Sequence, residues 1–258
     1  CSDQDGNVYF CDMKAPAVYR ISAKDGTKTE VAKESVSGLE FSPDGSLLYA
    51  CQGAKSRVIS INPSTGEVKT VAEGVKPNDL AVTRDGFLLF TDTGASQVTR
   101  INPKTGEVTP VDTGISKPNG IALSNDGGTV AVSDYGGTHT WTFRVSAGGV
   151  LDAKMPTMPM RLAINPKGEF RFNEPPPYVE TSRGDGMAVD KVGRYYVTSD
   201  LGVQIFDPTG RPCGVLPKVN PAEPLVTCIL AGPDHSSLYI AHGTKVYRRK
   251  LTVEKPKQ

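Results

Sequence analysis

A turn that recurs every forty residues is the feature that most constrains this chain. The words Ser22-Ala-Lys-Asp-Gly26, Asn62-Pro-Ser-Thr-Gly66 and Asn102-Pro-Lys-Thr-Gly106 place their glycines 40 residues apart. Asparagine and proline favour the start of a tight turn, and glycine supplies the positive φ needed before the next strand. A period of this length predicts a repeated supersecondary unit.

A second turn recurs out of phase with the first. Its copies are Asp5-Gly6, Asp44-Gly45, Asp85-Gly86 and Asp126-Gly127, with degenerate copies at Val192-Gly193 and Asp234-His235. Short aliphatic and aromatic runs flank these copies, such as 80–82 and 88–90, and such runs between turns are typical of strands. Two hairpins in each repeat predict a four-stranded antiparallel sheet. Six copies of the second turn therefore predict six sheets.

Small sheets of this kind bury both faces only by packing against one another, so we expect an all-β, six-bladed β-propeller. All 258 residues are assigned to this single domain. The interval from Gly127 to Gly193 is longer than the others, and we interpret its surplus, at about 150–180, as an elongated outer hairpin and a surface loop on the fourth blade. Counting back from Gly6 places the start of the first inner strand before Cys1, so the first blade is expected to be incomplete at its N-terminus.

Composition excludes several classes of partner. The net charge is +1, and the one basic block is Arg248-Arg249-Lys250, so nucleic acid is not expected as a ligand. No apolar run is long enough to span a membrane. The five cysteines contain no C-x-x-C word, which argues against a zinc-thiolate or redox site. The sequence is compatible with a cytoplasmic or an exported protein.

One position of the repeat carries an oxygen-bearing side chain in each of the five copies that the sequence contains. The residues eight places before the turn glycine, or before His235 in the last copy, are Ser37, Asn78, Asn119, Asp185 and Thr227. In a propeller this position faces the central channel at one mouth, so these side chains are expected to converge. A single Asn or Asp here would be an ordinary turn residue, but three in the same position favour a metal site. Hard oxygen ligands suit Ca²⁺ or Mg²⁺, whereas zinc sites normally include His or Cys.

Several words of the sequence resemble the senescence marker protein (regucalcin)/gluconolactonase family. They include Pro77-Asn-Asp-Leu80, Lys117-Pro-Asn-Gly-Ile-Ala-Leu-Ser124, Asp185-Gly-Met-Ala-Val-Asp190 and Gly202-Val-Gln-Ile-Phe-Asp-Pro-Thr-Gly210. The resemblance extends from Cys1 to about Leu251 and is weakest over 150–180. It implies a six-bladed propeller that binds one divalent cation in its channel and hydrolyses sugar lactones, other lactones or esters.

The resemblance also assigns roles to individual residues. It implies that Asn119 and Asp185 are cation ligands and that Asn78 lies near the cation on the substrate side. A further family ligand, a Glu of the first blade, falls three places before Cys1. Lys76 stands where some sugar lactonases have a substrate-contacting Arg, which keeps the charge but not the two-pronged donor. The expected cofactor is Ca²⁺, with Zn²⁺, Mg²⁺ and Mn²⁺ as alternatives.

These expectations combine into a predicted mechanism for opening a lactone. Asp185, the one carboxylate of the ring, is the expected general base and a cation ligand, and Asn78 would hold the substrate. Lys76, Arg183 and Tyr135 are further candidates for substrate contact. Four other acidic residues near strand ends are interpreted as turn or blade-linking residues: Asp79, Asp92, Asp134 and Asp200. Two alternatives stay open: a non-catalytic metal-binding scaffold, and an aryl-ester or phosphotriester hydrolase on the same metal site.

Overall fold

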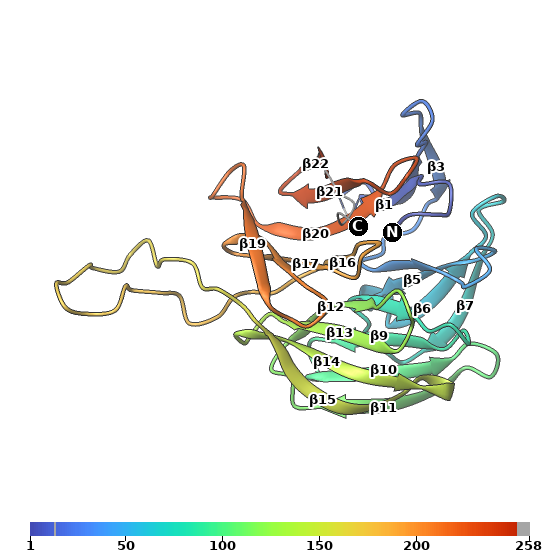
Figure 1. Cartoon of the computed structure of the whole chain (residues 1–258). Helices are drawn as coiled ribbons and strands as arrows, with labels where there is room; N and C mark the ends of the chain where they lie inside the picture. The colour runs from blue at the N-terminus through green and yellow to red at the C-terminus, as the bar shows by residue number, and fades with distance from the viewer. Residues whose placement is uncertain (13, 252–258) are drawn as a thin grey trace, which may run out of the picture.

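The computed structural model describes residues 1–12 and 14–251 and is a β-propeller of six sheets (Figure 1). The first blade consists of β1 (Val8–Asp12), β2 (Ala17–Ile21) and β3 (Lys28–Ala32). The second consists of β4 (Leu39–Phe41), β5 (Leu48–Gln52), β6 (Arg57–Ile61) and β7 (Val68–Glu73). The third consists of β8 (Leu80–Val82), β9 (Leu88–Asp92), β10 (Gln97–Asn102) and β11 (Glu107–Thr113).

The fourth blade consists of β12 (Pro118–Leu123), β13 (Thr129–Asp134), β14 (His139–Ser146) and β15 (Val150–Pro159). The fifth consists of β16 (Met187–Val189), β17 (Tyr195–Ser199), β18 (Gly202–Phe206) and β19 (Pro212–Pro217). The sixth consists of β20 (Leu225–Ala231), β21 (Ser237–His242) and β22 (Lys245–Lys250). The described residues also form two short 3-10 turns, η1 (Gly53–Lys55) and η2 (Ala147–Gly149). None of the helical segments among the described residues could cross a membrane.

The predicted fold class, a six-bladed β-propeller, is confirmed, but the first and last blades differ from the others in their number of strands. The four middle sheets have four antiparallel strands, whereas the first and last have three among the described residues. In the first blade a single bridge between Ser2 and Val8 stands where the innermost strand is expected, so this blade is incomplete, as predicted. The first and last blades are joined by the Ser2 hydroxyl, which donates to the Leu230 carbonyl at 3.0 Å, and by Gly232 N–H, which donates to the Gly6 carbonyl at 3.0 Å.

The two families of turn form where the repeat predicts them. Gly66 N–H and Gly106 N–H donate to the carbonyls of Asn62 and Asn102, each at 2.8 Å, and both glycines have φ +74°. A side chain at this φ is strained, which explains why glycine closes the hairpin. The turns leave the strands short, and buried aliphatic side chains such as Leu48 and Ile59 fill the space between neighbouring blades.

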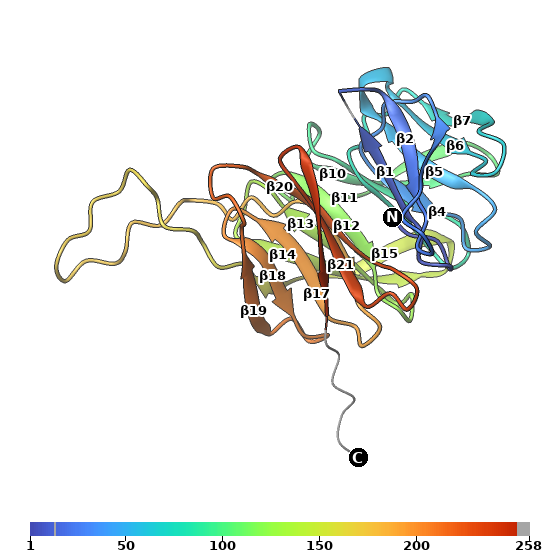
Figure 2. The same ribbon diagram turned by 90° about the horizontal axis from the view of Figure 1, so that it is seen from above.

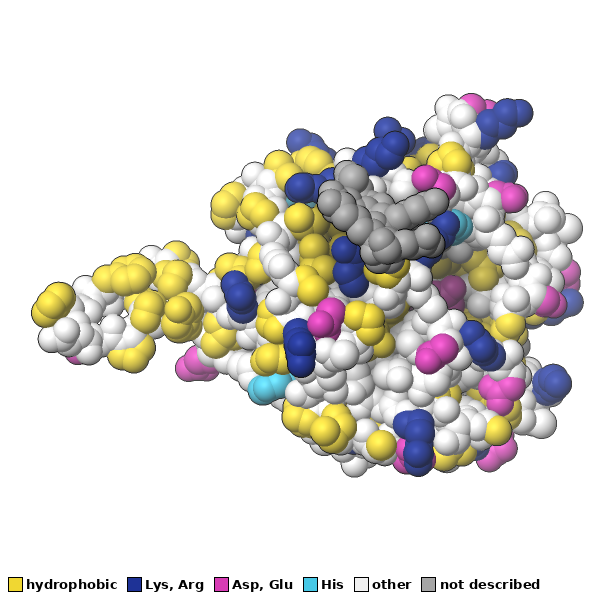
Figure 3. Space-filling view, viewed as in Figure 1, with side chains coloured by type: hydrophobic (Ala, Val, Ile, Leu, Met, Phe, Trp, Pro, Cys, Tyr) yellow, Lys and Arg dark blue, Asp and Glu magenta, His cyan; other side chains and the backbone are white. Residues whose placement is uncertain are grey.

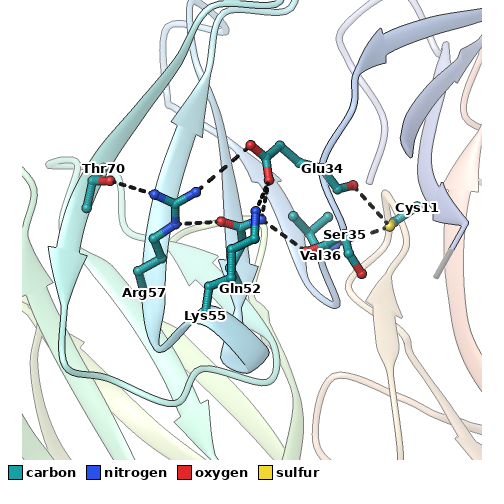
Figure 4. Close-up of polar contacts among 8 residues, drawn as sticks. All are labelled: Cys11, Glu34, Ser35, Val36, Gln52, Lys55, Arg57 and Thr70. Atoms are coloured by element: carbon teal, nitrogen blue, oxygen red, sulfur yellow. Dashed lines mark hydrogen bonds and ion pairs between the residues drawn. The ribbon is translucent and has the colours of Figure 1, made fainter. Parts of the chain in front are cut away.

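Polar contacts also connect the blades, and Figure 4 shows those between the first and second. The Glu34 carboxylate accepts hydrogen bonds from Lys55 at 2.9 Å and from the Gln52 amide at 2.6 Å. Arg57 Nε donates to the same Gln52 side chain at 2.7 Å. The connection from β3 to β4 is thereby tied to the ends of β5 and β6.

The chain between β15 and β16 forms an arm that projects from the propeller (Figures 1 and 2). A bridge between Ile164 and Tyr178 pairs its two sides. Hydrophobic side chains cover much of its surface in Figure 3, and Phe172 is 94% exposed. This arm and the long β14–β15 hairpin account for the surplus residues of the fourth repeat.

Candidate functional site

Three of the predicted site residues occupy successive places around one mouth of the channel. Asn78 lies two residues before β8, Asn119 is the second residue of β12, and Asp185 lies two residues before β16. The segments approach closely, because a Cβ added to Gly120 would lie 2.3 Å from the carbonyl oxygen of Asp185. At Gly38 an added Cβ would lie 3.1 Å from the carbonyl oxygen of Asn78. Glycine at these positions lets the starts of neighbouring inner strands touch.

Main-chain hydrogen bonds fix the mouth and leave the candidate side chains available. The carbonyl oxygens of Asn78, Asn119 and Asp185 accept from hydroxyls of the preceding blade, at 2.5, 2.5 and 2.7 Å. The N–H groups of Asn78 and Asp185 donate to carbonyls of the second strand of their own blades. Within the described chain, no side-chain donor bonds to the side-chain oxygens of these three residues. All three residues are half-buried.

Burial controls the charge of Asp185. Burial and, to a smaller extent, the nearby Asp79 carboxylate raise the pKa of this carboxyl to about 7, against the lowering effect of the Gly186 N–H. A carboxyl with a pKa near 7 is suited to accept a proton in neutral solution. A divalent cation at the mouth would favour the charged form of the same group.

Asp79 is a second carboxyl of the channel. Burial raises its pKa to about 6, against the lowering effect of N–H donors from Leu80 and Ile121. The Ile121 N–H lies on the next blade and donates to Asp79 Oδ2 at 3.3 Å, so the blade-linking interpretation of this residue agrees with the structure. Its place beside Asp185 was not foreseen. A comparison of the next repeat position would have signalled it, because Gly38, Gly120 and Gly186 are its equivalents.

The predicted substrate-contacting residues lie at the edge of the mouth rather than inside it. Lys76 is exposed and precedes Pro77 and Asn78. Arg183 is exposed two residues before Asp185, and its Nε lies 3.5 Å from Asp200 Oδ2. Tyr135 is half-buried, and its N–H donates to the Lys117 carbonyl at 2.9 Å. Their positions are compatible with contact to a bound substrate, and their roles remain predictions.

A cavity of about 420 Å³ occupies the channel beyond the mouth. Its walls include Ala81, Ile121 and Met187, which lie three, two and two residues past Asn78, Asn119 and Asp185. Asn78, Asn119 and Asp185 are not part of this wall and lie toward the opposite end of the inner strands. Glu40 is an acidic member of the wall, and burial raises its pKa.

The donor set decides which metal fits. Among residues 1–12 and 14–251, no three His, Cys, Asp or Glu side chains are grouped so that they could hold an ion. The candidate set, Asn78, Asn119 and Asp185, instead offers two carboxamide oxygens and one carboxylate. Hard oxygen donors of this type fit Ca²⁺. The set contains no imidazole or thiolate, which zinc normally requires.

Comparison with known proteins identifies the family of the chain. Residues 1–244 match the family described as SMP-30/Gluconolactonase/LRE-like region. A curated gluconolactonase of Zymomonas mobilis is 26% identical over 233 residues, which cover 82% of this chain and 62% of the relative. The chain therefore spans less than two thirds of the length of that relative.

Solved structures agree on the fold. A gluconolactonase from Xanthomonas campestris has a TM-score of 0.74 at 20% identity, covering 96% of this chain and 83% of that one. A regucalcin from Agrobacterium tumefaciens, described as a calcium-binding protein, has a TM-score of 0.68 at 17% identity, covering 95% and 81%. The match over nearly the whole chain, together with the propeller and the words that line its mouth, shows that the protein belongs to the SMP-30/gluconolactonase/LRE-like family.

Proposed function

We propose that the protein is a divalent-cation-dependent hydrolase that opens a sugar lactone or a related lactone. The observation that carries the proposal is that Asn78, Asn119 and Asp185 lie at the starts of three successive inner strands at one channel mouth, each with its carbonyl bonded to the preceding blade. Family membership and the gluconolactonase relatives support the reaction class. The regucalcin neighbour supports a cation, and the oxygen donor set supports Ca²⁺ as its identity.

The candidate residues would bind two groups, the cation and the substrate. Asn119 and Asp185 would hold the cation, with Asn78 beside it on the substrate side. When bound, the cation supplies polarisation of the lactone carbonyl and stabilises negative charge on its oxygen. Lys76 and Arg183 would attract the hydroxyl groups of the substrate or the carboxylate of the product, and Tyr135 would close the rim.

Asp185 would move the proton in this reaction. Its carboxylate accepts a proton from the water that attacks the carbonyl carbon, and the new C–O bond forms on that carbon. When the ring C–O bond breaks, the proton passes to the departing alkoxide oxygen. The products are an open-chain hydroxyl and a carboxylic acid, which ionises. Asp185 returns to its charged form without an external oxidant or reductant.

Proton release from a panel of sugar and aliphatic lactones tests this assignment. We expect Asp185→Asn to abolish cation-dependent ring opening, because the amide can neither accept the proton nor supply a ligand charge. Glu73→Gln removes an exposed carboxylate on β7 and should leave the rate unchanged. Full activity of Asp185→Asn with added calcium would refute the assigned role.

The same assay separates the two alternative functions. Chelator-sensitive hydrolysis of aryl esters or phosphotriesters, with every lactone inert, would favour a different hydrolase at this metal site. Calcium binding without hydrolysis of any of these compounds would favour a scaffold protein. Lactone hydrolysis that chelator removes and calcium restores is the result expected here.

A further inference from the structure

Three fully buried hydroxyl groups occupy the same place in successive blades. They belong to Thr91 on β9, Ser133 on β13 and Thr198 on β17, and each is 0% exposed. The equivalent residues of the second and sixth blades are Cys51 and Ala241, which pair with Gly38 and Thr227 of the inner strands. Sulfur or an aliphatic side chain therefore fits this position, so packing alone does not require a hydroxyl. In the sixth blade the mouth position is held by Val226, whereas the sequence predicted Thr227 there.

Each of the three hydroxyls reaches an inner strand of the next blade. Thr91 Oγ1 donates to the Asn119 carbonyl, and Ser133 Oγ donates to the Asp185 carbonyl. Thr198 Oγ1 lies 3.2 Å from the Val226 carbonyl. Two of the acceptors thus belong to the candidate cation ligands, and the third does not.

The hydroxyls also contact the inner strand of their own blade. Asp79 N–H donates to Thr91 Oγ1 at 3.2 Å, and Gly120 N–H donates to Ser133 Oγ at 2.9 Å. Each group therefore bridges two neighbouring inner strands at the level of the mouth. In the first blade, Cys11 stands at this position, and its sulfur accepts the Val36 N–H at 3.3 Å, one residue before Ser37 (Figure 4).

We propose that Thr91 and Ser133 are positioning residues that set the spacing between the cation ligands of successive blades and so determine the affinity of the site. This inference rests on the proposed function. A Ca²⁺ ion needs its oxygens at about 2.3–2.6 Å, and a ligand side chain is carried by the same residue whose carbonyl the hydroxyl fixes. Groups that orient ligands without touching the metal strongly influence metal affinity.

Calcium titration by calorimetry on the full protein tests the proposal. In Thr91→Val and Ser133→Ala the hydroxyl is lost, and we expect calcium affinity to fall by about 10-fold or more. Thr91→Ser retains the hydroxyl and should bind within about twofold of wild type. Thr198→Val is the matched control, because the Thr198 hydroxyl donates to the carbonyls of Gly186 and Val226 and to no carbonyl of a candidate ligand, and it should also bind within about twofold.

The outcomes distinguish this inference from the proposed function. Wild-type affinity in both Thr91→Val and Ser133→Ala would overturn the positioning role alone. An equal loss in Thr198→Val would overturn it too, since a general weakening of the blades would then explain the result. If Thr91→Val does not fold, Ser133→Ala decides, because it removes a single oxygen atom. A wild-type protein that does not bind calcium would overturn the cation site and this inference with it.

Discussion

Replacing Asp79 by Asn should stabilise the metal-free protein at neutral pH. Burial raises the pKa of this carboxyl to about 6, above the value of about 3.9 for an Asp in an unfolded chain. Folding is therefore favoured more by the protonated form than by the charged form. The contribution to stability is fully present below about pH 4 and is lost as the pH rises through about 6.

The pKa shift sets the size of the expected effect. A difference of about two pKa units corresponds to about 3 kcal/mol of stability lost between about pH 4 and pH 7. Asn carries no charge and removes this loss, but its amide accepts fewer hydrogen bonds than a carboxylate. The N–H groups of Leu80 and Ile121 both donate to Asp79, so one of them loses its acceptor. The lost hydrogen bond offsets about 1–3 kcal/mol of this gain, so we expect Asp79→Asn to be more stable by up to about 2 kcal/mol at pH 7.5.

Urea unfolding in chelator at pH 4.5 and 7.5 measures this difference. Wild-type protein should lose stability between the two pH values more steeply than Asp79→Asn does. Asp44→Asn is the control, because hydrogen bonds from Ser42 and Ser46 lower the Asp44 pKa to about 2, and this variant should gain nothing at pH 7.5. Equal stability of Asp79→Asn and wild type at pH 7.5, with equal pH dependence, would refute the account of a buried carboxyl whose pKa is raised.

Three further predictions concern the mouth of the channel. Asn119→Ala should weaken calcium binding by about 10-fold or more in calorimetry, because it removes a neutral oxygen ligand, and unchanged affinity would exclude that role. Gly120→Ala should lower the free energy of unfolding by about 1–3 kcal/mol, since the new methyl meets the Asp185 carbonyl, whereas Gly214→Ala has open space and should cost much less; equal losses would contradict the close approach of the blades. Lys76→Met should raise KM for sugar lactones more than for unsubstituted lactones, and a uniform effect on both would argue against contact with substrate hydroxyls.

The sequence predicted the fold well because local rules govern a propeller. Turn words such as Asn62-Pro-Ser-Thr-Gly66 determine a hairpin from a few neighbouring residues, and their spacing determines the number of blades. Equivalent positions then share a place around the axis. That symmetry brought Asn78, Asn119 and Asp185 to one mouth without knowledge of any long-range contact.

Features that arise between blades could not be predicted in the same way. Asp79 was placed among the turn or blade-linking residues, and its burial beside Asp185 depends on the glycines of neighbouring blades. The hydroxyls of Thr91 and Ser133 look like ordinary strand residues in the sequence. Their acceptors lie 28 and 52 residues further along the chain, so their role depends on packing of the folded ring.

Calcium-dependent ring opening by the wild-type protein tests the central claim most directly. Proton release from the lactone panel is measured in chelator, and then again after calcium is added in excess. The account predicts that chelator stops hydrolysis of at least one lactone and that calcium restores it. A folded protein that opens no lactone with any divalent cation, or one whose lactone hydrolysis chelator leaves unchanged, would contradict the account.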